Sequence, residues 1–226
     1  PGYWQLIVKN AQNIFLRSYY HNKVFINDPD ALLVRDYLGE KDDDFCTTLD
    51  EARVWATVVA MSGGPVLINE EIERLSDERK ELIRQVLPPI GVGLVPENFF
   101  EYPLCSRVQV TCGDARIAAA FNWTEETIDQ NLCLEEPVFA FDCWSKSFLG
   151  RCEKEIPLNA MAPHSVRALY LKKASKVPQF LCDDANFYMG MKTVKAVWEG
   201  TDLCLENARG NVYVYCPESW TCEHGE

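Results

Sequence analysis

Hydrophobic residues in the first third of the chain recur at three- and four-residue steps, which is the spacing of one face of a helix. Residues 3–20 show this pattern, with Trp4, Ile7, Val8, Ala11, Ile14 and Phe15 on one side. A second helix is expected after Thr48, because Thr48 and Glu51 have the spacing of a capping box and the following segment is apolar nearly all round. A third helix, capped by Ser76, is expected to end at Pro88.

Two short apolar runs separate these helices. Residues 24–26 and residues 66–68 have the length of strands, and we expect both strands to be buried. The first run ends in an Asn-Asp-Pro-Asp turn, and Ser62-Gly63-Gly64 ends the helix before the second. Residues 1–88 therefore alternate α-β-α-β-α, which predicts a parallel sheet covered on both faces or part of a barrel. Two strands make neither structure alone, because a complete (β/α)8 barrel takes about 250 residues.

The hydrophobic period changes to two from about residue 97. Alternating segments occur at residues 107–111, 138–141, 166–171 and 211–215, with further candidates at 117–123, 193–198 and 202–205. Short alternating strands with turn residues between them predict an antiparallel β-sandwich of about seven or eight strands. The predicted fold class is therefore α/β plus all-β. We place the division at residue 96, between a domain of residues 1–96 and a sandwich of residues 97–226.

The composition narrows the class of protein. With 47% hydrophobic and 25% charged residues, the 226-residue chain is of ordinary globular composition, which argues against wholesale disorder. Its net charge of −12 leaves no basic surface for nucleic acid or anionic lipid. No apolar run approaches the roughly 18–20 residues of a membrane span. We therefore expect neither a nucleic acid nor a membrane as a partner.

The ten cysteines show no metal-binding pattern, because no Cys-x-x-Cys pair and no Cys/His cluster with zinc spacing is present. We expect no metal and predict free thiols rather than disulfides, which favours a cytoplasmic over a secreted protein. A redox or metal protein built on the cysteines stays an alternative. Asn122-Trp123-Thr124 is a glycosylation sequon, but its apolar setting is typical of a strand end.

Several segments of the first half resemble the melibiase-type retaining α-galactosidases. Residues 25–33, FINDPDALL, resemble the family's strand-seven motif, in which Asn-Asp-Pro-Asp is followed by aliphatic residues. Residues 62–71, SGGPVLINEE, resemble strand eight, although Asn69-Glu70-Glu71 stands where the family often has Ser-Asp-Asp. The segment from Leu75 to Pro89 is similar to the last barrel helix of the family.

Motifs of the second half follow in the family's order. Residues 118–123, AAAFNW, resemble its Val-Phe-Asn-Trp strand. Residues 141–145, FDCWS, with Leu149-Gly150 after them, resemble its Asp-x-Trp turn, and residues 162–165, APHS, resemble its Pro-His strand start. The order and spacing of these motifs are more specific for the family than for any one substrate.

The resemblance implies the C-terminal part of a (β/α)8 TIM barrel followed by an antiparallel β-sandwich. The family hydrolyses terminal α-galactosides with an aspartate nucleophile and an aspartate acid/base about 5–5.5 Å apart, without a metal or organic cofactor. The nucleophile motif has no counterpart here, and Pro1-Gly2-Tyr3-Trp4 resembles the helix start that follows the acid/base. We therefore expect no catalytic residue in this chain. The expected partners are an α-galactoside and the upstream part of the enzyme, or a second chain, that completes the barrel.

Candidate substrate-binding residues follow the first short apolar run. Asn27, Asp28 and Asp30 are predicted to lie at the rim of the barrel, after a strand, where barrel enzymes carry out their chemistry. The alternative is a purely structural turn, in which Asp28 accepts hydrogen bonds from backbone amides around Pro29. Glu70-Glu71 is interpreted as a rim or capping feature rather than a catalytic pair.

Two alternative functions remain open at this point. One is a non-catalytic carbohydrate-binding or scaffold fragment, which Trp144 or Trp220 exposed on one sheet face would favour. The other is a related retaining α-glycosidase, such as an α-N-acetylgalactosaminidase. Trp123 and Trp144 are expected in the core, because tryptophan in a sandwich is more often buried than bound to a sugar.

Overall fold

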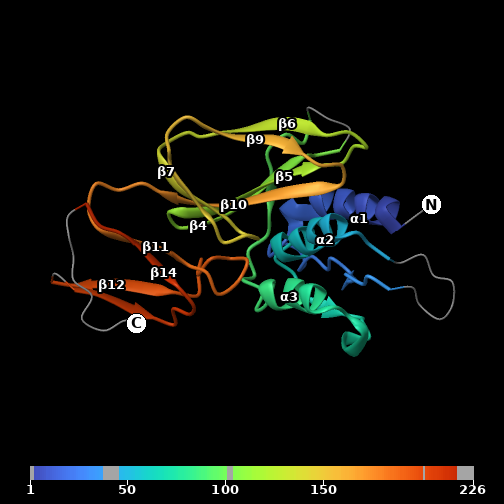
Figure 1. The fold of residues 1–226 in the computed structure, drawn as a ribbon, viewed down its shortest axis with the longest axis horizontal. Coiled ribbons are helices and arrows are strands. Elements are labelled where there is room, and N and C mark those ends of the chain that lie inside the picture. Colours follow the sequence, from blue (N-terminus) through green and yellow to red (C-terminus); the bar gives the residue numbers. More distant parts are fainter. Residues whose placement is uncertain (1–2, 38–45, 101–103, 201, 218–226) are drawn as a thin grey trace.

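A computed structural model describes residues 3–37, 46–100, 104–200 and 202–217. Three helices and a short pair of parallel strands come first in the chain, and antiparallel strands form the rest (Figure 1). Among these residues, no helix has both the length and the apolar character that crossing a membrane requires. Pro1, Gly2 and Trp220, on which two of the expectations above rest, lie outside the described residues.

The helices form where the apolar spacing predicts them. Helix α1 spans Tyr3–Arg17, and a 3₁₀ turn at Ser18–Tyr20 continues it. Helix α2 spans Leu49–Met61 and starts with the predicted capping box. In that box, the Glu51 amide donates to Thr48 Oγ1 at 3.2 Å, and the Thr48 amide donates to Glu51 Oε2 at 2.9 Å. After α2 the chain turns at Gly63, whose φ of 76° is in the left-handed region that favours glycine.

Helix α3 spans Asp77–Gln85 and differs from the prediction at its start. Ser76 occupies the N-cap position, but its side chain makes no cap hydrogen bond. The hydroxyl donates to Asp36 Oδ2 at 2.6 Å instead, so the serine ties α3 to the segment after the first strand. The predicted buried face is confirmed for Leu82 and Ile83.

The parallel strands correct two expectations. Strand β1 spans Ala31–Leu32 and strand β2 spans Leu67–Ile68, paired in parallel as 31 with 67 and 32 with 68. The predicted strand at residues 24–26 is wrong: Val24 is 72% and Ile26 64% exposed, and only a single bridge joins Phe25 to His21. A three-residue apolar run has no measurable period, and pairing with β2 selected the residues after the turn instead. Strand β2 lies within the predicted range, but both of its residues are exposed rather than buried.

A six-stranded antiparallel sheet dominates the second half. Its order is β3-β4-β5-β10-β7-β8, with β5 and β10 paired over eight residue positions at the centre. The bounds are β3 Val95–Pro96, β4 Arg107–Cys112, β5 Ala115–Asn122, β7 Val138–Asp142, β8 Phe148–Cys152 and β10 Ser165–Lys173. The division at residue 96 stays a prediction, although Val95 and Pro96 already pair with β4.

Three smaller antiparallel pairs complete the β structure. They are β6 Ile128–Cys133 with β9 Glu155–Met161, β11 Gln179–Asp183 with β14 Val212–Tyr215, and β12 Lys195–Glu199 with β13 Asp202–Glu206. All seven segments predicted from alternation contain strands. Strands β3, β6, β8, β9 and β11 were not predicted. Strand β6, with the sequence IDQNLC, shows why: its residues are mostly polar, so alternation does not mark it.

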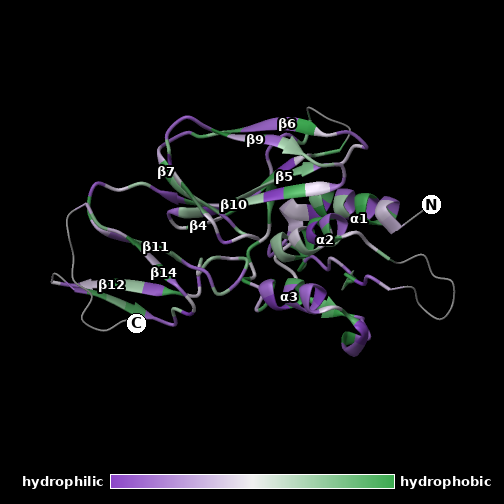
Figure 2. Ribbon diagram, viewed as in Figure 1, coloured by the Kyte–Doolittle hydropathy of each residue, from purple (hydrophilic) through white to green (hydrophobic). Residues whose placement is uncertain are grey.

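The large sheet is covered on both faces. Ala118, Ala120 and Leu169 pack in one cluster with residues of β6 and β9. Ile117, Phe121 and Tyr170 point the other way, into a larger core shared with α1, α2 and residues of β11 and β14. Figure 1 shows these layers above and below β10, and Figure 2 shows that α3, by contrast, is mostly hydrophilic. The helices and the sandwich therefore share one continuous core.

The sequence predicts free thiols, and nine of the ten cysteines lie in the described part of the chain. The nine cysteines in the described part of the chain are all free, and Cys105, Cys143 and Cys182 are buried. Burial raises the pKa of the Cys143 and Cys182 thiols well above the ordinary value. Protonated buried thiols are poor nucleophiles, which argues against a redox role for them.

The sequon residue Asn122 is the last residue of β5 and is fully buried. Its Nδ2 donates to the carbonyls of Glu126, Met161 and Ala162 at 2.7, 3.0 and 2.8 Å. A glycosylation enzyme cannot reach this nitrogen in the folded chain, so the strand-end interpretation is confirmed.

Candidate functional site

The predicted rim residues lie on the amino side of β1. Asn27, Asp28 and Asp30 precede Ala31–Leu32, whereas the expectation placed them after a strand. That placement is corrected, since it rested on the strand at residues 24–26. Leu33, Val34 and Arg35 follow β1, and Asn69 and Glu70 follow β2.

Asp28 and Asp30 form the predicted turn. The Asp30 amide donates to Asp28 Oδ1 at 2.9 Å, and the Ala31 amide donates to Asp30 Oδ1 at 2.7 Å. Asp30 has a φ of 70°, in the left-handed region that aspartate tolerates better than most residues. Both residues are exposed, so their carboxylates also have oxygen lone pairs available to solvent or to sugar hydroxyls. Their predicted contact with substrate stays a prediction.

Asn27 is buried and serves the packing of this turn. Its backbone amide donates to His21 Nδ1 at 3.1 Å. A Cβ added to Gly64 would lie 1.8 Å from the Asn27 carbonyl oxygen, so only glycine allows the turn before β2 to approach so closely. The Asn27 side chain is buried, and its predicted contact with substrate stays a prediction.

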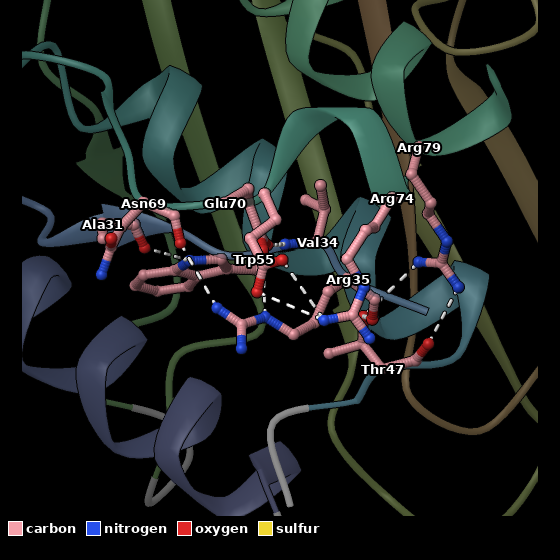
Figure 3. Close-up of polar contacts among 10 residues, drawn as sticks. Ala31, Val34, Arg35, Thr47, Trp55, Asn69, Glu70, Arg74 and Arg79 are labelled. Atoms are coloured by element: carbon pink, nitrogen blue, oxygen red, sulfur yellow. Dashed lines mark hydrogen bonds and ion pairs between the residues drawn. The ribbon is translucent and has the colours of Figure 1, made fainter. Parts of the chain in front are cut away.

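Glu70 joins the carboxyl ends of the two parallel strands (Figure 3). Its Oε1 accepts from the Val34 amide at 2.6 Å, and its Oε2 accepts from Arg35 Nε at 2.9 Å. The Arg35 Nη2 atom also donates to the Asn69 carbonyl at 3.3 Å. The carboxylate thus continues the pairing beyond Ile68, where backbone pairing between the strands has ended.

Glu70, with the Val34 amide and the Arg35 side chain that it binds, forms a clasp between the strand ends. Burial determines the electrostatics of this clasp. The Glu70 side chain is fully buried, and that desolvation raises the pKa of its carboxyl, although the Val34 amide and Arg35 oppose the rise. The charge of Glu70 also acts on Tyr3 of α1. Burial, and secondly the negative charge of Glu70, raise the pKa of the Tyr3 phenol. Glu71 turns away and pairs with Arg74 at 3.3 Å. The two glutamates therefore have different partners and do not form an acid–base pair, in agreement with the rim interpretation.

One further anchor holds the strand pair on α2, and another joins α3 to the start of α2. Trp55 of α2 donates from Nε1 to the Ala31 carbonyl at 3.0 Å (Figure 3). Arg79 of α3 donates to the carbonyls of Thr47 and Thr48 at 2.8 and 3.0 Å. The sequence did not predict either anchor, because nothing in a run of helical residues marks one side chain as a long-range donor. Only the position of Glu70, two residues after the end of a strand, pointed to part of this arrangement.

The chemistry available here is hydrogen bonding. Among the described residues, no group of three or more His, Cys, Asp or Glu side chains could hold a metal ion. The exposed aspartates of the turn can accept hydrogen bonds from hydroxyl groups, whereas Glu70 is occupied by its ion pair. The arrangement positions strand ends and offers oxygen acceptors beside them.

The predicted core tryptophans sit at the junction between helices and sandwich. Trp123 stacks on Phe121 at 4.7 Å, and Trp144 donates from Nε1 to Thr57 Oγ1 of α2 at 3.0 Å. Both are partly buried against the main core, so the expectation that they pack is confirmed. Trp144 is partly buried at this junction rather than standing fully exposed on a sheet face.

No family model matches the sequence, and no curated protein matches it. Solved structures do match. A GH27 β-L-arabinopyranosidase from Geobacillus stearothermophilus superposes with a TM-score of 0.63 at 20% identity, over 76% of this chain and 43% of that one. α-Galactosidase I from Mortierella vinacea gives 0.56 at 15% identity, over 71% and 43%. The α-galactosidase of Saccharomyces cerevisiae gives 0.55 at 12% identity, over 74% and 51%.

The chain has the fold of the C-terminal portion of these glycosidases. The resemblance inferred from sequence motifs and the predicted α/β plus β-sandwich architecture are confirmed at the level of the fold. The chain spans only about half the length of these enzymes or less.

Proposed function

We propose that this chain supplies the closing end of the barrel and the sandwich of an α-galactosidase-like retaining glycoside hydrolase. In this proposal β1 and β2 are the last two barrel strands. An upstream polypeptide, in the same product or as a second chain, supplies the other strands and both catalytic aspartates. The hydrolysis itself then needs no metal or organic cofactor.

One observation carries the proposal: the parallel strand pair has an exposed apolar strand, β2. Leu67 and Ile68 of β2 are 50% and 38% exposed, and Phe25 before β1 is 44% exposed. Parallel sheets occur almost only where both faces are covered, and a two-stranded sheet is at best marginally stable in water. Further parallel strands would extend this pair and cover its apolar side chains. The glycosidases with the same fold are about twice as long, which supports upstream barrel strands as the occupant.

The carboxyl ends of the pair suit the rim of a sugar pocket. Glu70 and Arg35 fix the two strand ends relative to each other at 2.9 Å, and Trp55 fixes β1 on α2. Asp28 and Asp30 offer exposed oxygen acceptors beside this frame. The chain would thus contribute hydroxyl recognition and rigidity, while the bond-breaking carboxylates come from upstream.

Native mass spectrometry of the purified protein tests the proposal. We expect a companion polypeptide to travel with the 25.8 kDa chain and the complex to hydrolyse an aryl α-galactoside. If the complex hydrolyses the matching aryl α-N-acetylgalactosaminide faster, the protein is still a retaining glycosidase, but its substrate is an α-N-acetylgalactosaminide. A lone monomer, or a self-associated form, that hydrolyses neither substrate would overturn the proposal and favour a scaffold or carbohydrate-binding role.

Charge substitutions locate the contact surface. Leu67→Asp should abolish association with the companion, because it places a carboxylate on the apolar strand surface that the barrel must cover. Val177→Asp is the matched control, since Val177 is 63% exposed and precedes β11 in the sandwich region. Equal association of both variants would contradict barrel closure through β2.

A further inference from the structure

A cavity of about 390 Å³ lies where α2 meets the sandwich. Asp50 and Arg53 line it from the first turns of α2, and Asp142 and Trp144 line it from the end of β7. Asn159 of β9 and Arg167 of β10 complete the polar wall. None of its lining residues belongs to β1 or β2, so this cavity is distinct from the strand ends described above.

The charged side chains of the cavity are already balanced. Asp142 accepts from Arg167 Nε at 3.2 Å through Oδ2, and from two backbone amides of its own turn through Oδ1. Asp50 pairs with Arg53 at 3.5 Å. Two acidic and two basic residues leave no net charge to attract an ion. The donors and acceptors that remain suit a neutral ligand with many hydroxyl groups.

Trp144 gives the cavity a rigid aromatic wall. Its Nε1 donates to Thr57 Oγ1 at 3.0 Å, and its ring packs on Phe187 with centroids 5.0 Å apart. The indole is only partly buried, so part of it remains available at the cavity. An aromatic ring fixed in this way offers an apolar surface to the C–H face of a pyranose without the entropic cost of ordering a free side chain.

Two donors at the cavity lack partners. Arg53 Nε is buried and has no hydrogen-bond partner among the described residues. The Asn159 amide is exposed, and within the same part of the chain its side chain makes no hydrogen bond. Arg53 Nε itself has almost no accessible surface, so a ligand oxygen would meet Arg53 through the rest of its side chain, which is 37% exposed.

We propose that this cavity binds a neutral saccharide of one or two pyranose units, as a site separate from the proposed barrel pocket. Its volume falls within the roughly 300–1,000 Å³ of small-molecule sites. Trp144 packs against a sugar ring, while Arg53 and Asn159 donate to its hydroxyl oxygens. The site lies entirely within this chain, so it does not depend on an upstream polypeptide or on hydrolysis.

Isothermal titration calorimetry of the purified protein with methyl β-D-galactopyranoside tests the site, because this neutral sugar lacks the α-linkage that the proposed enzyme would cleave. We expect saturable binding. Arg53→Met and Asn159→Ala should each weaken it by about fivefold to tenfold through the loss of a donated hydrogen bond. Asn131→Ala on β6 is the matched control, since Asn131 is also an exposed residue of the β6–β9 pair, and it should leave binding unchanged.

Three results would overturn the site: no binding of the neutral sugar, binding that Asn159→Ala leaves intact, or binding only of the anionic D-galacturonate. Asn159 is exposed, so its variant should keep the unfolding midpoint of the parent and remain decisive if Arg53→Met fails to fold. The outcome is also separable from the proposed function. A chain that has no companion and hydrolyses no substrate can still bind the sugar in calorimetry. Conversely, a complex that hydrolyses the aryl α-galactoside can still lack this site.

Discussion

The six-stranded sheet and strand β2 of the parallel pair use similar aliphatic residues, but these residues are buried in the first and exposed in the second. In the six-stranded sheet, Leu169 and Leu171 of β10 are buried beneath β6 and β9. In the parallel pair, Leu67 and Ile68 of β2 face solvent. The first sheet is held by its covering layers, whereas the second is held by the Glu70 carboxylate and the Trp55 indole. A hydrophobic segment therefore indicates a strand, but its side chains stabilise the fold only where another layer covers them and removes them from water.

A matched pair of leucine truncations should show the largest contrast. Leu169→Ala is expected to cost about 2–5 kcal/mol of unfolding free energy, because it opens a cavity in a covered sheet. Leu67→Ala should stay within about 0.5 kcal/mol, because that side chain is half exposed. Chemical denaturation of the isolated chain measures both. A large loss for Leu67→Ala would mean that the surface of β2 is covered in solution by another copy of the chain.

The clasp of the parallel pair should depend on one of two neighbouring glutamates. Glu70→Ala is expected to cost about 1–3 kcal/mol, because the Val34 amide loses its acceptor and Arg35 loses its buried carboxylate. Glu71→Ala should cost less than about 0.5 kcal/mol, since its pair with Arg74 is exposed. If both variants lost the same unfolding free energy in denaturant, the buried Glu70 clasp would contribute no more to stability than the surface ion pair of Glu71.

The smallest effect concerns pH. Burial raises the pKa of Glu70 in the folded chain, so the folded state holds this proton more tightly than the unfolded state. Its contribution to stability is therefore fully present below the ordinary glutamate pKa and is lost as pH rises through the raised value. Relative to Glu70→Gln, which does not titrate, the parent chain should lose stability as pH rises above the ordinary glutamate pKa of about 4.3. Unfolding midpoints taken as the pH is raised measure the difference, and a constant or opposite trend would show that the clasp favours the charged carboxylate.

Much of the fold could be predicted because the signals are local. The capping box of Thr48 and Glu51 and the left-handed turn at Gly63 depend on residues a few positions apart. Strand β10 lies between two covering layers, so consecutive residues from Ala168 to Leu171 are apolar and buried, and this run is visible in the sequence. Strand β6 lacks such a signal because only Leu132 of its six residues is buried, and its polar residues resemble those of a loop.

The candidate site was only partly predictable. Local sequence indicated the turn that joins Asp28 to Asp30, since its hydrogen bonds span two residues. The ion pair between Arg35 and Glu70 joins positions 35 residues apart, and no pattern in a single sequence pairs them. The sugar cavity is a stronger case, because Arg53, Trp144 and Asn159 come from three elements that meet only in the folded chain.

The sequence by itself determined where helices start and stop, which half is built of alternating strands, and the glycosidase motifs in their order. These properties depend on backbone propensity and side-chain period, which act over a few residues. Only the tertiary structure decided that β1 is Ala31–Leu32 rather than the apolar run before it, and that the surface of β2 stays uncovered. Strand pairing and burial are long-range choices, made by the partner that a segment meets rather than by the segment's own residues.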